Sequence, residues 1–429
     1  MSSSVASGPF LSVIVIGGGA AGFFAAITCA QTHPHCQVTL VEAGRDCLSK
    51  VRISGGGRCN VTHACFDPAQ LVQYYPRGGK ALRGAFSRFQ PQDTIAWFQS
   101  RGIALKTEAD GRIFPQSDRS DTIIHCLETA AAAAGVSVEP GSGVVALEEI
   151  PPAETAAIAN SPPGARFRVT LKNGEVRGAD RLLLATGSSA SGYRFAQHLG
   201  HSLIPPVPSL FTFQVRDPAL HARAGVSVPQ AQVRLKVGTK TLEQTGALLI
   251  THWGFSGPAI LKLSAWGARL LHESQYHGAL SVHWLPDHSP DRLRETLLEA
   301  KTSHSRKQLS NYCPLALPQR LWGYLLERSH IAPDSRWADL SKTGLNRLVT
   351  ELSQGHYAIQ GKGVFKDEFV TCGGVSLKEV DFKTMASRCC PGLYLAGEIL
   401  DVDGVTGGFN FQNAWTTGWL AGQALGQGL

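Results

Sequence analysis

The chain has 429 residues and a formal net charge of +7, with 43% hydrophobic and 17% charged residues. This balance excludes wholesale disorder, the length suits about two or three domains, and the lack of an apolar run of about 18 residues excludes a transmembrane helix. The mild charge suits an anionic small-molecule substrate, and without a dense Lys/Arg run we expect no nucleic-acid partner and, from the start "MSSSVASGPF", no signal peptide.

The first predicted element is a buried strand, Leu11 to Ile16, followed by a glycine turn and a helix rich in Ala and Phe. Gly17, Gly19 and Gly22 fit G-x-G-x-x-G, whose glycines permit a tight turn, close approach of a pyrophosphate and helix–strand packing. A second strand ends in Glu42, where a carboxylate would hold ribose hydroxyls. We therefore predict a dinucleotide site. Its further backbone contacts would come from Ala20, Ala21 and Ala43.

The next motif, "SGGGRCNVTH" (residues 54–63), we name the opening loop; it could be a phosphate cradle, a metal or thiol site, or a loop over a flat cofactor. The preceding glycine turn already offers a phosphate cradle. Cys59, His63 and Cys65 lack the paired spacings of structural zinc sites, so we expect no metal. Cys47 and Cys59 lie too far apart for the C-x4-C pair of disulfide reductases. That leaves a loop over a flat cofactor, with contacts from Gly55, Gly56, Gly57, Arg58, Cys59 and Asn60.

The 10 cysteines show no C-x-x-C pair, so we expect reduced thiols in a cytoplasmic protein. Further along, Ser120 or Asp121 is expected to cap a helix over 122–135, and a strand should follow over 136–150.

A hairpin with Asn173-Gly174 at its tip leads into a buried strand that ends in "ATG". A β-meander feeding such a strand is the second fingerprint of FAD-binding domains with two dinucleotide-binding motifs. In those domains the backbone at the position of Val144 faces adenine. The expected cofactor contacts of the strand end are Ala185, Thr186 and Gly187.

The middle of the chain alternates between strand and helix patterns. Strands are expected over about 205–255, a helix from Pro258, amphipathic helices over 291–309 and 317–327, and a strand segment over 355–374.

The third fingerprint begins with a short strand from Leu393 to Ala396, followed by Gly397 and Glu398, where flavoproteins place an acid near the ribityl chain and phosphates. A glycine turn from Gly404 to Gly408 then opens a final helix. Its amino end, with unpaired N–H groups and a partial positive charge, would stabilise reduced flavin. The expected contacts are Gly407, Gly408, Phe409 and Asn410.

Together, "GGGAAG", "SGGGRCNVTH" and "GLYLAGEILDVDGVTGGFNFQNAW" resemble the BaiN/YhiN-like family of NAD(P)/FAD-dependent oxidoreductases. Further matching segments lie at 110–120, 207–213, 251–261 and 369–385, so the resemblance spans Val13 to Gly422. It implies an α/β fold: a Rossmann-like FAD-binding domain, split in sequence, with an inserted β-rich domain that carries a small helical subdomain. We place the FAD-binding domain at 1–195 and 366–429, and the insertion at 196–365 with its helices at about 286–354.

The resemblance implies FAD as cofactor and NAD(P)H as electron donor. No second G-x-G-x-x-G follows a strand, so a nicotinamide nucleotide would need a site between the flavin face and the insertion. Four side chains are candidates for chemistry, each with a structural alternative. Cys59 is a thiolate or a packed side chain, His63 a proton donor or a structural histidine, and Arg112 an anion grip or a surface ion pair; His252 faces the pocket or solvent.

We predict an FAD-dependent oxidoreductase that moves a hydride through flavin N5 to or from an activated carbon–carbon double bond. Two alternatives stay open: a non-catalytic FAD-binding sensor, and a flavin-dependent nucleic-acid-modifying protein. The second should show a basic face near Arg292, Arg294, Lys301, Arg306 and Lys307. The sequence leaves the oligomeric state undetermined.

Overall fold

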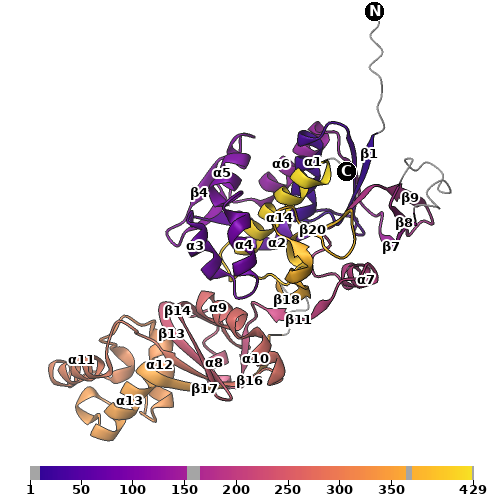
Figure 1. Ribbon diagram of the computed structural model, residues 1–429. Helices are drawn as coiled ribbons and strands as arrows, with labels where there is room; N and C mark the ends of the chain where they lie inside the picture. The colour runs from indigo at the N-terminus through magenta and orange to yellow at the C-terminus, as the bar shows by residue number, and fades with distance from the viewer. Residues whose placement is uncertain (1–9, 152–164, 364–369, 428–429) are drawn as a thin grey trace, which may run out of the picture. The chain divides into compact units, whose positions relative to one another are not determined.

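The computed structural model describes residues 10–151, 165–363 and 370–427 (Figure 1). The chain forms two compact units. Unit 1 combines Met1–Pro206 with Val370–Leu429, and unit 2 is Val207–Phe369. The Pro/Ala-rich stretch at 150–165, whose composition predicts a surface loop, falls almost wholly outside the described residues.

Unit 1 is built on a seven-stranded sheet with the order β19-β20-β21-β10-β1-β2-β6. Its strands from β21 to β6 run parallel, and β1 is central because its apolar side chains are covered on both faces. The bounds are β1 Leu11–Ile16, β2 Cys36–Val41, β6 Ser137–Glu139, β10 Arg181–Leu184, β19 Val380–Asp381, β20 Ala386–Ser387 and β21 Leu393–Leu395. The glycine turns of the sequence follow the carboxyl ends of β1, β10 and β21, the edge where α/β proteins bind ligands.

Two long helices of unit 1 pack unusually closely (Figure 1). A Cβ added to Gly418 or Gly422 of α14 would lie 2.6 Å from the carbonyl oxygen of Ala21 or Ala25 of α1, so neither position can take a side chain without a shift. The helices of unit 1 are α1 Ala20–Thr32, α2 Ser49–Gly57, α3 Pro68–Leu71, α4 Gly79–Phe86, α5 Pro91–Gln99, α6 Ser120–Ala133, α7 Ala190–His198 and α14 Phe409–Leu425.

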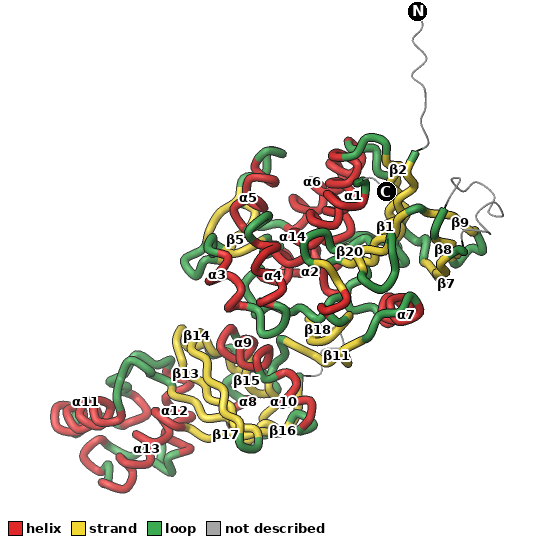
Figure 2. Tube along the Cα trace, viewed as in Figure 1, coloured by secondary structure: helices red, strands yellow, loops and turns green. Residues whose placement is uncertain are grey.

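Three small sheets complete unit 1 (Figure 2). They pair β3 Thr62–His63, β5 Arg112–Pro115 and β4 Leu105–Thr107; β7 Val144–Glu149, β8 Phe167–Leu171 and β9 Val176–Ala179; and β11 Leu203–Ser209 with β18 Val370–Val375.

Four local predictions were wrong. The helix expected over 291–309 ends at Ser303, and the strand segment expected over 355–374 contains two strands of different sheets, Gly355–Lys362 and Val370–Val375. The single strand expected over 136–150 is two strands in different sheets, because a turn with Gly141 at φ 77° separates β6 from β7. Neither Ser120 nor Asp121 caps α6. Arg119 holds the N-cap position, and the Ser120 hydroxyl donates to the Arg52 carbonyl instead.

Unit 2 consists of a closed six-stranded barrel and helices. The barrel order is β12-β15-β14-β13-β16-β17, with bounds β12 Phe213–Val215, β13 Ser227–Val237, β14 Lys240–Ile250, β15 Gly254–Ser256, β16 His277–His283 and β17 Gly355–Lys362. The helices are α8 Pro218–His221, α9 Pro258–Trp266, α10 Ala268–Glu273, α11 Pro290–Ser303, α12 Gln319–Arg328 and α13 Lys342–Gln354. Helix α9 starts at Pro258, as expected. One buried cluster joins the barrel and α11–α13 through Trp284, Trp322 and Trp337.

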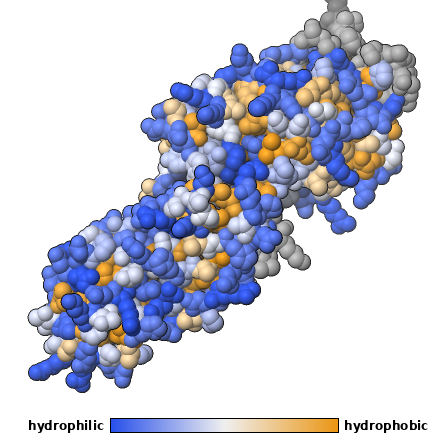
Figure 3. All heavy atoms as spheres, turned by 60° about the horizontal axis from the view of Figure 1, so that its bottom comes forward, coloured by the Kyte–Doolittle hydropathy of each residue, from blue (hydrophilic) through white to orange (hydrophobic). Residues whose placement is uncertain are grey.

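The visible face in Figure 3 is mostly hydrophilic, with apolar residues in small patches. Within the described ranges, none of the helices has the length and apolar character needed to cross a membrane. The ten cysteines, all within those ranges, are free thiols.

Candidate functional site

The glycine turn between β1 and α1 combines packed and open positions. Gly17 has φ 114°, and an added Cβ would lie 2.4 Å from the Ala185 carbonyl oxygen; one on Gly22 would lie 2.0 Å from that of Gly17. A Cβ on Gly19 would meet nothing within 4 Å. Gly19 is also the N-cap of α1 and supplies no capping side chain. The first N–H groups of α1, which include Ala20 and Ala21, therefore face an open space suited to an anion.

Glu42 lies at the end of β2, beside this turn. Its carboxylate accepts hydrogen bonds from the backbone N–H of Gly18 and of Gly44, both at 2.7 Å. The next residue, Ala43, lies 3.4 Å from the Cβ position of Gly143, just before β7 and Val144. The loop after β2 thus adjoins the start of the meander.

A cavity of about 290 Å³ opens near the ends of β2 and β6. Its lining includes Phe23, Arg45, Cys47, Glu128 and Val138, so it combines an apolar floor with charged groups.

The turn after β10 meets the Gly397-Glu398 turn after β21. A Cβ on Gly187, at φ 59°, would lie 3.7 Å from Glu398 Oε2, and one on Gly397 would lie 2.9 Å from the Cβ of Ala21. The three strand ends therefore converge. Thr186 instead turns toward α7, because a Cβ on Gly192 would lie 1.8 Å from its hydroxyl oxygen.

Sequence reasoning missed Lys50, one turn before the opening loop. Its Nζ lies 2.5 Å from Glu398 Oε2 and 3.3 Å from the hydroxyl of Ser188. The other oxygen of Glu398 accepts from the Thr371 N–H at 3.0 Å. No sequence motif marks Lys50, and Arg52 lies two residues further on in the same helix, so the sequence alone does not single out Lys50.

The opening loop leaves helical geometry at Ser54 and passes through left-handed conformations at Gly55, Gly56 and Gly57. Added Cβ atoms on Gly56 and Gly57 would meet nothing within 4 Å, whereas one on Gly55 would lie 2.9 Å from the Phe114 ring. Two of the three glycines thus leave backbone open to an approaching flat group.

The opening loop is held against α14 by buried hydrogen bonds. The Trp415 indole donates to the Val61 carbonyl at 2.8 Å, and the Thr62 hydroxyl donates to Gln412 Oε1 at 2.6 Å. With its amide nitrogen toward the Thr62 carbonyl, Asn60 accepts from the Gly408 N–H at 2.9 Å. These contacts join segments that lie more than 340 residues apart along the chain.

The glycine turn that opens α14 is also fixed from within. The Asn410 amide both accepts from the Gly404 N–H, at 2.8 Å, and donates to its carbonyl, at 2.9 Å. Buried Asp403 forms an ion pair with Arg77, another residue that sequence reasoning missed. The Asn410 side chain, which was expected to contact the cofactor, thus bonds to the backbone of the glycine turn.

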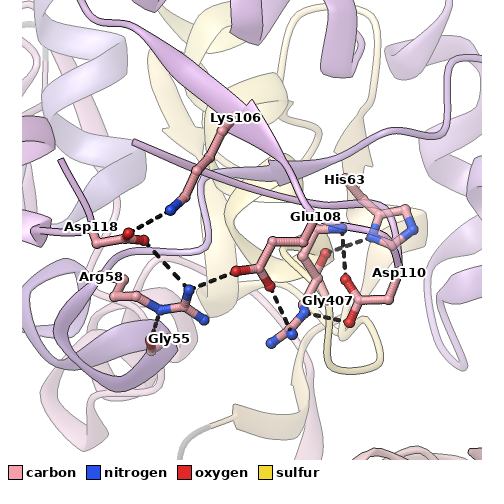
Figure 4. Close-up of polar contacts among 9 residues, drawn as sticks. Gly55, Arg58, His63, Lys106, Glu108, Asp110, Asp118 and Gly407 are labelled. Carbon is pink, nitrogen blue, oxygen red and sulfur yellow. Dashed lines mark hydrogen bonds and ion pairs between the residues drawn. The ribbon is translucent and has the colours of Figure 1, made fainter. Parts of the chain in front are cut away.

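Arg58 and Arg112 both take part in a network of ion pairs (Figure 4). Arg58 lies 2.7 Å from Glu108, which raises the pKa of the guanidinium, and its head group stacks 3.9 Å from the Phe114 ring centre. Arg112 pairs with Asp110 at 2.7 Å and with Glu108 at 3.0 Å. Both positive charges are thus locally balanced.

The three remaining candidates for chemistry lie in different surroundings. Cys59 is fully buried, and burial raises the pKa of its thiol to about 12. His63 donates from Nδ1 to the Gly407 carbonyl at 3.0 Å, and its ring lies against Phe409 with ring centres 4.6 Å apart and planes tilted by 31°. His252 is exposed in unit 2, between β14 and β15.

A parallel sheet whose glycine turns meet at one edge defines a Rossmann-like dinucleotide-binding enzyme. The chain belongs to the family described as HI0933-like protein Rossmann domain, which matches residues 11–424. This is the BaiN/YhiN-like family that the sequence motifs resemble, so that prediction is confirmed. The chain is an FAD-dependent oxidoreductase.

Three relatives of known description match almost the whole chain. A 3-dehydro-bile acid delta(4,6)-reductase of Clostridium scindens is 32% identical and covers 96% of this chain and 98% of its own. A ribosomal RNA dihydrouridine synthase of Escherichia coli is 31% identical, covering 96% and 97%. One of Haemophilus influenzae is 30% identical, covering 96% and 98%.

Proposed function

We propose that FAD binds along the edge formed by the carboxyl ends of β1, β2, β10 and β21. The α1 N-terminus would hold the diphosphate, Glu42 the ribose hydroxyls, and the opening loop with the α14 N-terminus the isoalloxazine ring. The observation that supports this best is the open space at Gly19, Gly56 and Gly57, next to glycines that are packed against backbone. Side chains at these positions would fill the cradle.

The proposed reaction is reduction of a carbon–carbon double bond conjugated to a carbonyl group. The names of the bile acid reductase and of the dihydrouridine synthases describe this chemistry. The first reduces the 4,6 double bonds of a 3-dehydro bile acid, and the second converts uridine to dihydrouridine. When bound and reduced by two electrons, the flavin would supply a hydride for the carbon β to the carbonyl and return to its oxidised form, and a proton would complete the α carbon. The proposed source of the two electrons is NADH or NADPH.

The chain's own contribution is to fix the opening of α14. Its amino end carries a partial positive charge that would stabilise negative charge developing on a bound ring or substrate. Asn60 and His63 hold Gly408 and Gly407, which set the direction of this helix end. Because a carbonyl oxygen only accepts, Nδ1 of His63 carries the proton in its hydrogen bond to Gly407.

Anaerobic stopped-flow spectroscopy of the purified yellow protein tests this function. We expect NADH or NADPH to bleach the flavin, and a steroid enone or a uridine-containing RNA to restore its absorbance, while the saturated ketone does not. Bleaching by dithionite alone would overturn the nicotinamide donor. Reduced protein that no conjugated alkene reoxidises would overturn the reaction.

A second candidate narrows the substrate to uridine in ribosomal RNA. Two of the relatives carry that activity in their names. Of the five basic residues expected to form a nucleic-acid face, Arg292 pairs with Glu295, while Arg294 and Lys301 are bound to neighbouring groups. Within the described part of the chain, Arg306 and Lys307 are exposed and form no ion pair. Lys307 lies 4.7 Å from the centre of the Tyr312 ring, which also stacks on His304 with ring centres 4.0 Å apart, so the two exposed cations are the groups that would suit RNA phosphates.

Mass spectrometry of ribosomal RNA from cells with and without the chain tests this candidate. Dihydrouridine that disappears with the chain and returns with it would support an RNA substrate. The double variant Arg306→Glu, Lys307→Glu should then bind RNA with a shallower salt dependence and keep its enone rate. Equal dihydrouridine in both cells, with RNA binding unchanged in the variant, would exclude it.

A further inference from the structure

A cluster of metal-ligating side chains lies in unit 1, outside the candidate cofactor site. His201 follows α7, Glu379 precedes β19, and Cys389 follows β20. Their ligand atoms lie within 4.8 Å of one another, and His201 Nδ1 is 3.2 Å from Glu379 Oε2. The three residues bring together nitrogen, oxygen and sulfur donors, a set that zinc accepts.

The surroundings hold these side chains in place. The His201 side chain is fully buried, and its Nε2 pairs with the Ser387 hydroxyl at 2.9 Å, so Nδ1 is the nitrogen that faces Glu379. Glu379 also accepts from the Ser202 N–H at 2.8 Å, and Ser387 accepts from the Cys389 N–H at 3.0 Å. Metal-binding histidines have such a partner on the nitrogen that does not bind the metal. Because Ser387 also accepts from the Cys390 N–H at 2.8 Å, its hydroxyl donates to Nε2 and Nδ1 donates to Glu379, so metal binding at Nδ1 must release this proton.

The geometry requires only a small adjustment. Tetrahedral zinc with bonds of about 2.0–2.3 Å separates its ligand atoms by about 3.3–3.8 Å, so the cluster must contract by roughly 1.5 Å at most. Exposed Cys389 can make that movement more easily than buried His201. The Cβ of Cys389 lies 3.7 Å from the position that a Cβ on Gly200 would take. Gly200 lines a cavity of about 660 Å³ together with His198, Glu149 and Arg168.

We propose that His201, Glu379 and Cys389 bind one zinc ion, with the fourth coordination position open to water beside exposed Cys389. Three protein ligands and one exchangeable position are the arrangement of zinc sites that keep a reactive water, in contrast to closed four-ligand structural sites. The competing interpretation is a hydrogen-bonded chain of Ser387, His201 and Glu379 that only connects α7 to the strand region. That chain would be complete without Cys389.

Zinc content of the full-length, untagged yellow protein separates the two. After chelator treatment, addition of zinc chloride and gel filtration, we expect about one zinc per chain by plasma mass spectrometry. Cys389→Ser and Glu379→Gln should retain less than about a tenth of it, and Ser387→Ala should bind zinc about 10–100-fold more weakly. Cys390→Ser is the matched control, since the Cys390 thiol turns to Glu149 and not to the cluster, and it should keep its zinc.

Flavin content of each variant reports whether unit 1 is folded. X-ray absorption at the zinc edge of the unmodified protein should show one sulfur at about 2.3 Å and lighter ligands at about 2.0–2.2 Å, whatever the variants do. No retained zinc, equal retention in Cys389→Ser, or a zinc environment without sulfur would each overturn the site.

Discussion

Cys59 adopts a left-handed backbone conformation with φ 61°, although it is not glycine. Its side chain is fully buried, so packing of the thiol offsets the unfavourable backbone. Because burial raises the thiol pKa from 9.0 to about 12, the thiolate fraction near neutral pH falls about 1000-fold. Cys59 is therefore a packed side chain in a protein whose redox chemistry belongs to its cofactor.

Alkylation checks this assignment. Treated with iodoacetamide at about pH 8 after a chelator has removed any bound metal, folded protein should leave Cys59 unmodified while exposed Cys389 reacts, because the reagent needs both a thiolate and access. Because the Cys59 pKa is raised, its thiolate forms and reacts only as the pH rises toward 12. Peptide mapping by mass spectrometry gives the readout, and unfolded protein is the positive control. Early labelling of Cys59 would contradict the assignment.

Lys50 provides a second residue-scale prediction, which depends on the proposed FAD position. With Lys50→Met, the Glu398 carboxylate loses its counter-ion beside the proposed flavin chain and phosphates. We expect the FAD dissociation constant to rise about 3–10-fold, since the pair is partly exposed and screened. Flavin fluorescence titration measures it.

Two controls accompany this experiment. Lys50→Arg should restore most of the affinity. Arg52→Met removes a cation of the same helix that pairs with Asp121 at the surface, and it should leave FAD binding unchanged. An equal loss of FAD affinity in Arg52→Met would show that only the net charge of the helix matters. Unchanged FAD affinity in Lys50→Met would show that Lys50 is not part of the FAD site.

At the scale of elements, the packing of α14 on α1 depends on two missing side chains. Gly418→Ala would place a methyl group 2.6 Å from the Ala21 carbonyl oxygen, so α14 must shift. We expect destabilisation by about 1–3 kcal/mol and earlier flavin release on heating, since α14 also carries the turn proposed to face the ring. Chemical denaturation with flavin fluorescence measures both.

Gly84→Ala in α4 is the matched control. An added Cβ there meets nothing within 4 Å, so the substitution should be neutral or stabilise by about 0.4–1 kcal/mol. If the two variants behave alike, close packing of α1 on α14 is not what Gly418 serves.

Element prediction succeeded for the first strand and failed at a proline–glycine turn. The first strand was expected from Leu11 to Ile16 and has those bounds, because an apolar run ends at a glycine that only a tight turn explains. The prediction of one strand over 136–150 was wrong because strand-like residues lie on both sides of Pro140-Gly141. Alternation of apolar and polar residues alone does not show which sheet each half joins.

The site divides in the same way. The glycine motifs predicted the cofactor-binding turns, because the residues of each motif are neighbours in the sequence. The Lys50–Glu398 pair joins residues 348 apart, and His201 and Glu379 lie 178 apart, so no spacing rule could place them together. Arg58 was expected near a cofactor from its neighbours in sequence, but its carboxylate partners come from the β4–β5 region and only the fold shows them.

At the scale of the whole molecule, each unit has the means to fold by itself. The buried cluster of unit 2 contains residues from Phe213 to Ile359 only, all within that unit. Every glycine turn proposed to hold FAD lies in unit 1. Binding energy from the cofactor should therefore stabilise one unit and leave the other unchanged.

Scanning calorimetry of the flavin-free protein should accordingly show two transitions. FAD at about 100 times its dissociation constant adds about 2.7 kcal/mol to the unit that binds it, which raises that transition by roughly 5–10 °C. Leu348→Ala identifies the other transition, because it opens a cavity in the fully buried core of unit 2 and should lower that peak alone. A single transition, or two that rise together with FAD, would show that the units unfold as one cooperative body.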